Sequence, residues 1–462
     1  MLLAFAATWN GCTDKDADYV RLSNNAFTFS ADGSEEFTVE IDANDTWVAN
    51  YDNSWITVIQ ESKNLVTIKA TPSRSNGIRK TQITITSGYA EENIYLTQLG
   101  SNVSFSKMDQ NSVTYVISPN GKYVAGVSVK LKDNVYSYIP YVIDTQTGEK
   151  SEYPTLDYNV EAAAISDTGI YVLLVFNGSA KYYNLQKELI EVKLPNGHEQ
   201  AYVQGVSSDG EIFVGYTKNS SDKLYYPIRW VNNTPNIMDA PTKDTNGNPV
   251  ELGSMARGCS ADGTVIYGSC WDDFTGIYWK DGGAWQYIGG RDAINTHQII
   301  ISQNGNYYQK TVVDRPILLA EISNISTSGR YIAISYQKIT ADSKGTETLT
   351  KYPAVFDVET GAFTILTELP GSFSSGTART VSNKGQLSFA CQQDKTYIGF
   401  VYDTNKGTTL PLPQFVEAEY GFVLTSEESY IRRFAKDGEV ILGGTYIASG
   451  SSMDYWFIAA LE

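Results

Sequence analysis

The chain has 462 residues, which is enough for two or three domains unless one repeat architecture takes up most of the length. Its 52 acidic residues outnumber its 35 basic residues and give a net charge of -17, so nucleic acid is not an expected partner. Only two histidines occur, His198 and His297, and no Cys-x-x-Cys pair is present. We therefore expect neither a metal site nor a histidine-dependent catalytic triad, and no cofactor.

Residues 1–16 begin with the apolar run MLLAFAATWNGC, which is followed by the polar and acidic stretch TDKDADY. This pattern resembles the end of a bacterial lipoprotein signal, although no Lys or Arg precedes the apolar run. The resemblance implies that Cys12 carries a lipid anchor and that the protein lies at the outer membrane, facing the cell exterior. No other segment has the ~18 apolar residues that a membrane helix requires, so contact with the membrane is expected through the anchor only.

Residues 17–100 alternate apolar and polar residues over short runs that are broken by Gly, Asn and Asp, a pattern typical of an antiparallel β-sandwich. Four features occur in order: Trp47, WITV from Trp55, Arg79 before ITIT, and LTQLG at the end. Together they resemble the BACON domain, an immunoglobulin-like module of Bacteroidota surface proteins. The resemblance implies either a carbohydrate-binding module or a spacer. We expect Trp47 and Trp55 to fill the sandwich core.

Residues 101–462 repeat one short pattern, in which a strand ends at a turn such as Ser-Asp-Gly and a second strand follows. The turn glycines are 41 to 66 residues apart: Gly121, Gly169, Gly210, Gly263, Gly329, Gly385 and Gly438. Residues 201–240 contain one complete copy, which reads as a four-stranded meander with tight turns. Four strands at such a period predict a β-propeller. The fold class is therefore all-β, with a sandwich followed by a propeller.

We expect seven blades, with eight as the alternative. The doubt arises from ISQNGNYYQKTVV, which begins at Ile301 and looks like a further copy, although only 24 residues separate Gly305 from Gly329. It predicts either a hairpin inserted before the fifth blade or a degenerate first half of that blade. The sequence pattern of the second and third strands, with a recurrent Trp near the third, resembles HAF-type repeats and, more broadly, WD40-like propeller repeats.

The candidate ligand-binding surface lies on the propeller face that carries the loops between second and third strands and between blades. On that face we expect WDDFTG (271–276), residues 338–351 and residues 413–429. An aromatic residue beside carboxylates is typical of sugar-binding and peptide-binding patches. The alternative is that Trp271 packs on the neighbouring blade and both aspartates stay solvated. The candidate binding residues are Trp271, Asp272, Asp273, Phe274, Tyr420 and Phe422.

Catalysis is not expected, and no catalytic residue is assigned. Adjacent Asp-Gly pairs at Asp209 and Asp262 differ from sialidase Asp boxes, and no Gly-x-Ser-x-Gly motif occurs. The run DTNGNPVE (244–251) alternates oxygen-bearing residues, as calcium loops do, but it reads better as an Asn-Gly turn. Cys259, Cys270 and Cys391 are expected to be buried free thiols, because Cys259 and Cys270 are not opposite each other across their hairpin.

An anchor, a spacer and a propeller together resemble the accessory surface lipoproteins that accompany TonB-dependent nutrient transporters of the starch-utilisation type. The resemblance implies a non-catalytic recognition or scaffold subunit. Its partners would be the transporter and its lid lipoprotein, with a glycan or peptide as ligand. The alternative is a propeller glycoside hydrolase or lyase that acts on the same polymers.

Overall fold

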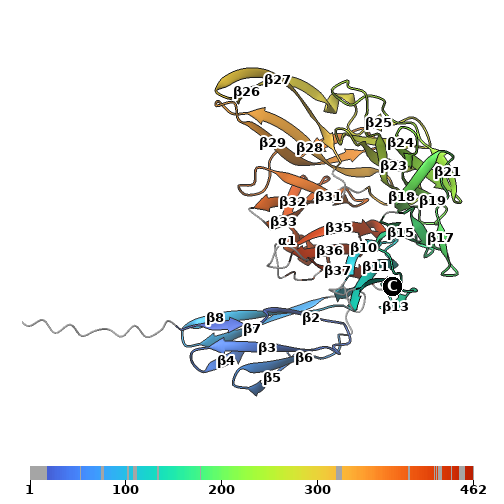
Figure 1. The fold of residues 1–462 in the computed structure, drawn as a ribbon. Helices are drawn as coiled ribbons and strands as arrows, with labels where there is room; N and C mark the ends of the chain where they lie inside the picture. The colour runs from blue at the N-terminus through green and yellow to red at the C-terminus, as the bar shows by residue number, and fades with distance from the viewer. Residues whose placement is uncertain are drawn as a thin grey trace, which may run out of the picture. The chain divides into compact units, whose positions relative to one another are not determined.

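The computed structural model describes residues 18–460 except 53, 74–77, 101–102, 108–111, 133–134, 177, 319–324, 394–395, 421, 423, 425–428, 439 and 447–452. Cys12 and the predicted anchor segment lie outside these residues. The chain divides into two compact units, residues 1–102 with 421–425, and residues 103–420 with 426–462. Both are built of β-sheets (Figure 1), whose strands pair antiparallel except for one parallel pair in the first unit, between residues 26–29 and 95–98.

The first unit is a sandwich of two four-stranded sheets. One sheet has the order β1 (Val20–Leu22), β3 (Glu36–Ala43), β6 (Leu65–Ala70) and β5 (Ile56–Ser62). The other has the order β2 (Ala26–Phe29), β8 (Ala90–Gln98), β7 (Arg79–Ser87) and β4 (Trp47–Asn50). Alternating residues of both sheets point inward and form one apolar core.

The residues that identify the sandwich in the sequence are tied together in the structure. Trp55 is 6% exposed and belongs to the core, and Trp47 is half-buried against it, as expected. The guanidinium carbon of Arg79 lies 4.7 Å from the Trp55 ring centre, and Arg79 Nε donates to Gln98 Oε1 at 2.7 Å. Gln98 is fully buried and donates in turn to the Thr71 carbonyl at 2.9 Å. The spacing of these residues therefore reflects one packed cluster.

The second unit contains seven sheets within the described residues, in agreement with the expected seven blades rather than the alternative of eight. The first four sheets are each a four-stranded meander. Their strands are β10 (Ser112–Ile117), β11 (Tyr123–Lys132), β12 (Val135–Asp144), β13 (Lys150–Glu152); β14 (Val160–Ile165), β15 (Tyr171–Val175), β16 (Lys181–Tyr183), β17 (Leu189–Glu191); β18 (His198–Val206), β19 (Ile212–Asn219), β20 (Tyr225–Val231), β21 (Thr234–Ile237); β22 (Ser254–Cys259), β23 (Val265–Cys270), β24 (Gly276–Lys280), β25 (Gln286–Tyr287).

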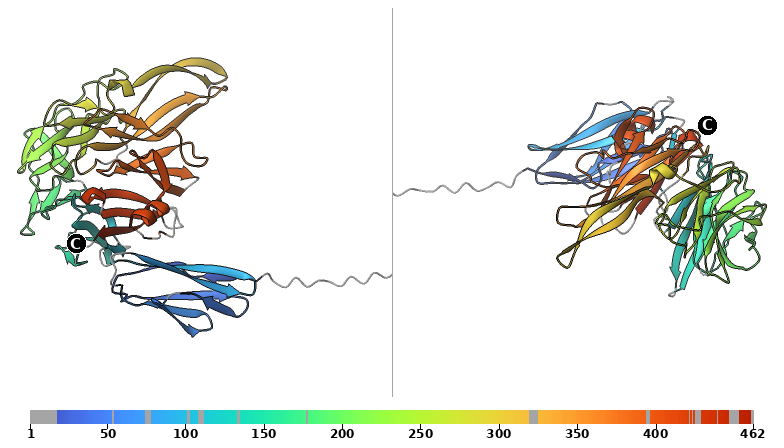
Figure 2. Two further views of the ribbon diagram at one scale, coloured as in Figure 1. Left: turned by 180° about the vertical axis from the view of Figure 1, so that it is seen from behind. Right: turned by 90° about the horizontal axis from the view of Figure 1, so that it is seen from above.

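The fifth sheet has five strands because a hairpin is joined to it. Its strands are β26 (Asn295–Gln303), β27 (Asn306–Ile317), β28 (Tyr331–Ala341), β29 (Glu347–Asp357) and β30 (Phe363–Ile365). β27 pairs with β26 along most of its length and with β28 only at Arg315–Ile317. The extra copy in the sequence is therefore an inserted hairpin whose second strand continues into the blade. This hairpin extends beyond the other sheets of the propeller (Figures 1 and 2).

The last two sheets complete the propeller. The sixth contains β31 (Gly376–Val381), β32 (Gln386–Gln393), β33 (Thr396–Asp403) and β34 (Thr408–Pro411), and helix α1 (Leu412–Tyr420) follows. The seventh contains β35 (Ser429–Ala435), β36 (Val440–Tyr446), β37 (Met453–Ala460) and, as its fourth strand, β9 (Val103–Lys107). Because β9 comes from the start of the unit, its pairing with β37 joins the two ends of the propeller.

The repeated turn explains the repeated sequence. In the third sheet, Ser207 is fully buried; its hydroxyl donates to Asp209 and accepts from the Ile212 backbone amide. Gly210 follows with a φ of 79°, which side chains rarely adopt. Hydrogen bonds also connect turns of neighbouring blades: the Asp167 amide donates to the Ser208 carbonyl, and the Ser208 amide donates to the Ala261 carbonyl. These bonds link the second, third and fourth sheets.

Two segments differ from their predicted form. Residues 338–351 are expected to be a loop, but β28 and β29 extend through most of them to a short turn at 342–346. Residues 413–429 are also expected to be a loop, but they begin with most of α1. Leu412, Phe415, Val416 and Tyr420 are the buried residues of that helix. Their spacing of three and four residues is helical and is missed when the segment is treated as irregular.

The three cysteines in the described residues are free and buried, as expected: Cys259, Cys270 and Cys391. Cys259 is opposite Ile266 and Cys270 is opposite Ser254 across the β22–β23 pair. Burial raises the pKa of each thiol to about 12. They are therefore protonated side chains of the core at physiological pH.

Candidate functional site

The turn between β23 and β24 carries four of the six predicted binding residues, and it divides them into two pairs. Asp272 accepts hydrogen bonds from the backbone amides of Glu251 (2.7 Å) and Leu252 (3.1 Å). Asp273 is 6% exposed and accepts from the backbone amide and the hydroxyl of Thr245, at 2.9 and 2.6 Å. The two carboxylates therefore hold the 242–252 loop in place and are not simply solvated.

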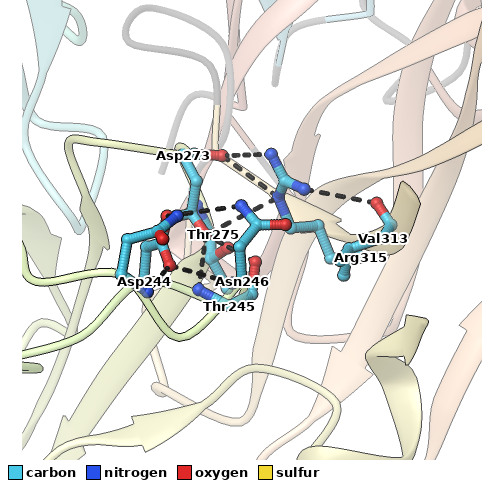
Figure 3. Close-up of polar contacts among 8 residues, drawn as sticks. Asp244, Thr245, Asn246, Asp273, Thr275, Val313 and Arg315 are labelled. Carbon is cyan, nitrogen blue, oxygen red and sulfur yellow. Dashed lines mark hydrogen bonds and ion pairs between the residues drawn. The ribbon is translucent and has the colours of Figure 1, made fainter. Parts of the chain in front are cut away.

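Asp273 is also linked to the fifth sheet. Arg315, on β27, donates from Nε and Nη2 to the Asp273 carbonyl at 3.2 and 3.0 Å, and its Nη1 donates to the Val313 carbonyl (Figure 3). The Thr275 amide donates to Asp273 Oδ1 at 3.0 Å. The turn is thus fixed from the 242–252 loop on one side and from β27 on the other.

Trp271 and Phe274 belong to a group of stacked rings that we call the aromatic cluster: Tyr202, Tyr216, Tyr225, Trp271 and Phe274. Trp271 stacks on Tyr225 with ring centres 5.5 Å apart, and it lies 6.4 Å from both Tyr216 and Phe274. Tyr202 and Tyr216 are cross-strand partners on β18 and β19 and stack at 4.6 Å. The cluster therefore spans the third and fourth sheets.

Arg257 adds a positive charge to the aromatic cluster. It lies on β22, and its guanidinium carbon is 5.2 Å from the Trp271 ring centre and 5.8 Å from that of Tyr216. Burial raises the pKa of Tyr202 to about 12 and also raises the pKa of Tyr216. Both hydroxyls are therefore protonated at neutral pH. The cluster combines ring faces, a cation and phenolic donors.

Phe274 is the most exposed member of the aromatic cluster, at 40%. Its backbone φ of 59° lies in the left-handed region, which is unfavourable for a bulky residue. The Phe274 carbonyl accepts a hydrogen bond from the Leu318 amide at 2.9 Å, and Thr275 forms a bridge with Ile317. These contacts maintain the strained turn while it presents an apolar ring to solvent.

Tyr420 lies in the interior of the second unit and Phe422 groups with the first unit, so both are removed from the candidate surface of the propeller. Tyr420 is 9% exposed and its hydroxyl donates to the Gly438 carbonyl, while Phe422 is 6% exposed. Burial raises the pKa of Tyr420 well above its ordinary value. Tyr420 is the last residue of α1, and the helix turns it inward. Its predicted exposure depended on the wrong assignment of residues 413–429 as a loop.

The sequence reasoning missed Tyr202, Tyr216, Tyr225 and Arg257. The available signal was the set of tyrosines in AYVQGV, VGYT and LYYPIRW, which lie on three successive strands of one predicted meander. Register decides whether such tyrosines meet, because a shift of one residue moves a side chain to the other face of a sheet.

A pocket of about 490 Å³ is lined in part by the 242–252 loop. Its lining includes Lys243, Thr245, Trp285, Tyr287 and Arg291. Trp285 and Tyr287 meet edge to face at 4.9 Å, and the Arg291 guanidinium carbon lies 5.3 Å from the Tyr287 ring centre. Thr245, which Asp273 holds, thus forms part of the wall.

The proposed calcium-like run is a turn. Asp244 Oδ1 accepts from the backbone amides of Asn246 and Asn248 at 2.9 and 2.8 Å. Across the described ranges, no three His, Cys, Asp or Glu side chains gather as metal ligands would. Within the same ranges, no helix combines the length and the apolar character needed to cross a bilayer.

Comparison with known proteins finds a family match within the first unit. Residues 45–99 match the BACON family, described as a putative binding domain, N-terminal, which confirms the resemblance for that segment. No curated protein matches the chain.

Three solved structures illustrate what the chain is similar to. A prolyl endopeptidase is 10% identical with a TM-score of 0.41, over 87% of this chain and 54% of that one, so this chain spans about half its length. TolB from Acinetobacter baumannii is 10% identical with a TM-score of 0.34, over 79% of each chain. The β-propeller domain of the Trilobed protease from Pyrococcus furiosus is 10% identical with a TM-score of 0.32, over 75% of this chain and 92% of that one.

Proposed function

We propose that the protein is a non-catalytic recognition protein and that its propeller binds a saccharide through the aromatic cluster. The observation that carries this proposal is the exposed Phe274 ring, which a strained backbone holds beside Trp271. The guanidinium of Arg257 lies against the same Trp271 ring. Aromatic rings stack on the apolar faces of sugars, and the guanidinium and phenolic groups donate hydrogen bonds to sugar hydroxyls. Such a surface serves binding without chemistry.

The occupied carboxylates support a binding role over hydrolysis. A glycoside hydrolase requires two carboxyl groups that face the scissile bond. Asp272 and Asp273 are the acids nearest to Trp271 in sequence, and both accept hydrogen bonds from the 242–252 loop. Neither is placed as a free acid or base.

The decisive experiment is a titration of the purified protein with neutral oligosaccharides, followed by calorimetry. We expect a dissociation constant of about 0.1–1 mM, because one or two exposed rings contribute only a few kcal/mol. Trp271→Ala should weaken binding about tenfold or more. Tyr307→Ala is the matched control, since Tyr307 is 63% exposed on the β26–β27 hairpin, away from the cluster. Turnover of a polysaccharide that depends on a pair of carboxylates would instead establish the hydrolase or lyase alternative.

The cellular setting is part of the same proposal. Cys12 would anchor the protein in the outer membrane, facing outward, and the sandwich would separate the propeller from the membrane. The partners would be a TonB-dependent transporter and its lid lipoprotein. A stable complex would need to bury on the order of 1,000 Å² or more, and affinity purification from native membranes would test it.

The anchor has its own test. Cys12→Ala should release the protein from the outer membrane into the periplasm, because the thiol is the site of lipid attachment. Fractionation and palmitate labelling measure this. A Cys391→Ala variant, which removes a buried thiol, should remain in the membrane fraction. Continued labelling of Cys12→Ala would contradict the anchor.

A further inference from the structure

Arg379 occupies a recurrent position on the innermost strands of the propeller. Five of these strands carry a register shift just before the repeated turn, and the extra residues are Ala163, Gln204, Arg257, Arg379 and Arg432. Three of the five are arginines, in the fourth, sixth and seventh sheets. Arg257, in the fourth sheet, lies against Trp271. Arg379 occupies the equivalent strand position in the sixth sheet.

Arg379 is buried, with 8% of its surface exposed, and the Nε atom of its guanidinium has no hydrogen-bond partner among the described residues. Its nearest characterised contacts are the rings of Tyr430, 4.4 Å from the guanidinium carbon, and Tyr397, 5.6 Å away. Ring faces recover only part of the cost of removing a guanidinium from water.

Some arginines of the propeller have acceptors, whereas the Nε atoms of Arg229 and Arg433, like that of Arg379, have none among the described residues. Arg315 donates to the Asp273 carbonyl, and Arg330 donates to Asp357 Oδ2 at 3.0 Å. Arg432 is the equivalent of Arg379 in the seventh sheet, and it donates to the Tyr455 hydroxyl at 2.8 Å. Arg379 combines an Nε that has no acceptor among the described residues with a guanidinium that lies against two tyrosine rings.

We propose that Arg379, on the first strand of the sixth sheet, binds the carboxylate of an acidic saccharide such as a uronic acid. The inference rests on the proposed saccharide-binding function and specifies its ligand class. A guanidinium forms paired hydrogen bonds with a carboxylate, which would supply the missing acceptor. Since the chain carries a net charge of -17, an anionic ligand would need a local positive charge such as that of Arg379 to bind.

The test compares trigalacturonic acid with neutral galactotriose, titrated into the full chain by calorimetry. The wild type should bind the acidic trisaccharide about tenfold more tightly than the neutral one. Arg379→Met should reduce this preference to about twofold or less and leave the melting temperature of the unliganded protein unchanged or higher, since it removes a buried charge. Arg229→Met removes the same charge from β20, an outer strand, and should retain the preference.

A second variant keeps the test decisive if Arg379→Met folds poorly. Arg379→Lys retains the charge but loses the paired geometry, so its preference should fall between those of the wild type and Arg379→Met. Equal binding of the two trisaccharides by the wild type, or an unchanged preference in either Arg379 variant, would overturn the inference.

The outcomes separate this inference from the proposed function. If neither saccharide binds, both fail. If the neutral saccharide binds in a Trp271-dependent manner and the acidic one binds no better, only the inference fails. A tripeptide with a free carboxyl terminus and its amidated form make up the last arm. Arg379-dependent binding of the free tripeptide without binding of either saccharide would overturn the saccharide class.

Discussion

Among individual residues, hydrogen-bond partners decide which side chains can contact a ligand. Asp273 and Phe274 are neighbours in the sequence, but Asp273 is buried against Thr245 while Phe274 is exposed. Sequence composition marks both as candidates, because an acid and a ring side by side are typical of binding patches. The structure assigns them different tasks: one maintains the turn and the other presents a ring.

Asp273→Ala should lower the free energy of unfolding by about 2–4 kcal/mol. The change leaves the part-buried Thr245 amide and the buried Thr275 amide without their acceptor, and it removes the carboxylate beside Arg315. Urea denaturation measures the effect. Asp272→Ala is the control, because Asp272 is more exposed, and it should cost less. A loss below 1 kcal/mol for Asp273→Ala would contradict the structural role of this carboxylate.

Phe274→Gly should change the free energy of unfolding by no more than about 1 kcal/mol. Glycine adopts the left-handed backbone of this position without strain, and this gain offsets the lost contacts of a ring that is 40% exposed and lies against Trp271. Binding of saccharide should weaken at the same time, as measured by calorimetry. Phe274→Tyr preserves the ring and should preserve binding. A large loss of stability in Phe274→Gly would show that the ring serves packing.

At the level of the structural element, the repeated turn is a hydrogen-bonded unit with a charged centre. Burial acts to raise the pKa of Asp262, but hydrogen bonds from Ser260 and Thr264 outweigh it and lower the pKa below its ordinary value. The first sheet has Asn120 in the equivalent position, which accepts bonds from Ser118 and Lys122. The geometry therefore needs an acceptor oxygen, and only the aspartate version titrates.

Asp262→Ala should be less stable than the wild type at pH 7, and the difference should shrink as the pH falls below about 4. A carboxylate with a lowered folded pKa contributes stability above its unfolded pKa, and this contribution is lost as the pH falls through the folded pKa. Urea denaturation at several pH values measures it. Asp262→Asn retains the acceptor and should show a smaller loss at pH 7. A difference between Asp262→Ala and wild type that persists unchanged at pH 2 would contradict this account.

For the whole molecule, closure of the propeller depends on one short strand. β9 supplies the fourth strand of the seventh sheet, while the other three come from the C-terminal end of the chain. The seventh sheet also shares a core with the first, in which Phe457 lies near Tyr115 and Ile117. Pairing of distant segments therefore holds the ends of the ring together.

A chain that starts at residue 101 should fold and unfold cooperatively, whereas one that starts at residue 108 should melt at a lower temperature and aggregate. Loss of β9 exposes the edge of β37, and an exposed edge can pair with other chains. Calorimetry and size-exclusion chromatography compare the two. Equal melting temperatures would contradict the role of β9 in closure.

The blades could be predicted from the sequence because their turns and strands depend on residues that are close together in the chain. A turn with Gly210 at a φ of 79° requires glycine, and the strands beside it alternate in polarity, so each hairpin has a signature within about ten residues. The same reasoning identified the sandwich, its Trp55 core position and the extra hairpin from Ile301. These features depend on neighbours in the chain, which a sequence contains directly.

Only the tertiary structure decided which side chains form the candidate site. Tyr202, Tyr216 and Trp271 lie on separate strands and meet because of strand register and blade packing. Tyr420 is buried in the folded protein and is therefore not part of the surface. Arg379 Nε has no acceptor among the described residues because none of the segments packed around it supplies one. The sequence by itself determined the repeated elements and the two-part organisation. Exposure, stacking and unmet hydrogen bonds are relations between distant segments, so the folded chain alone decides them.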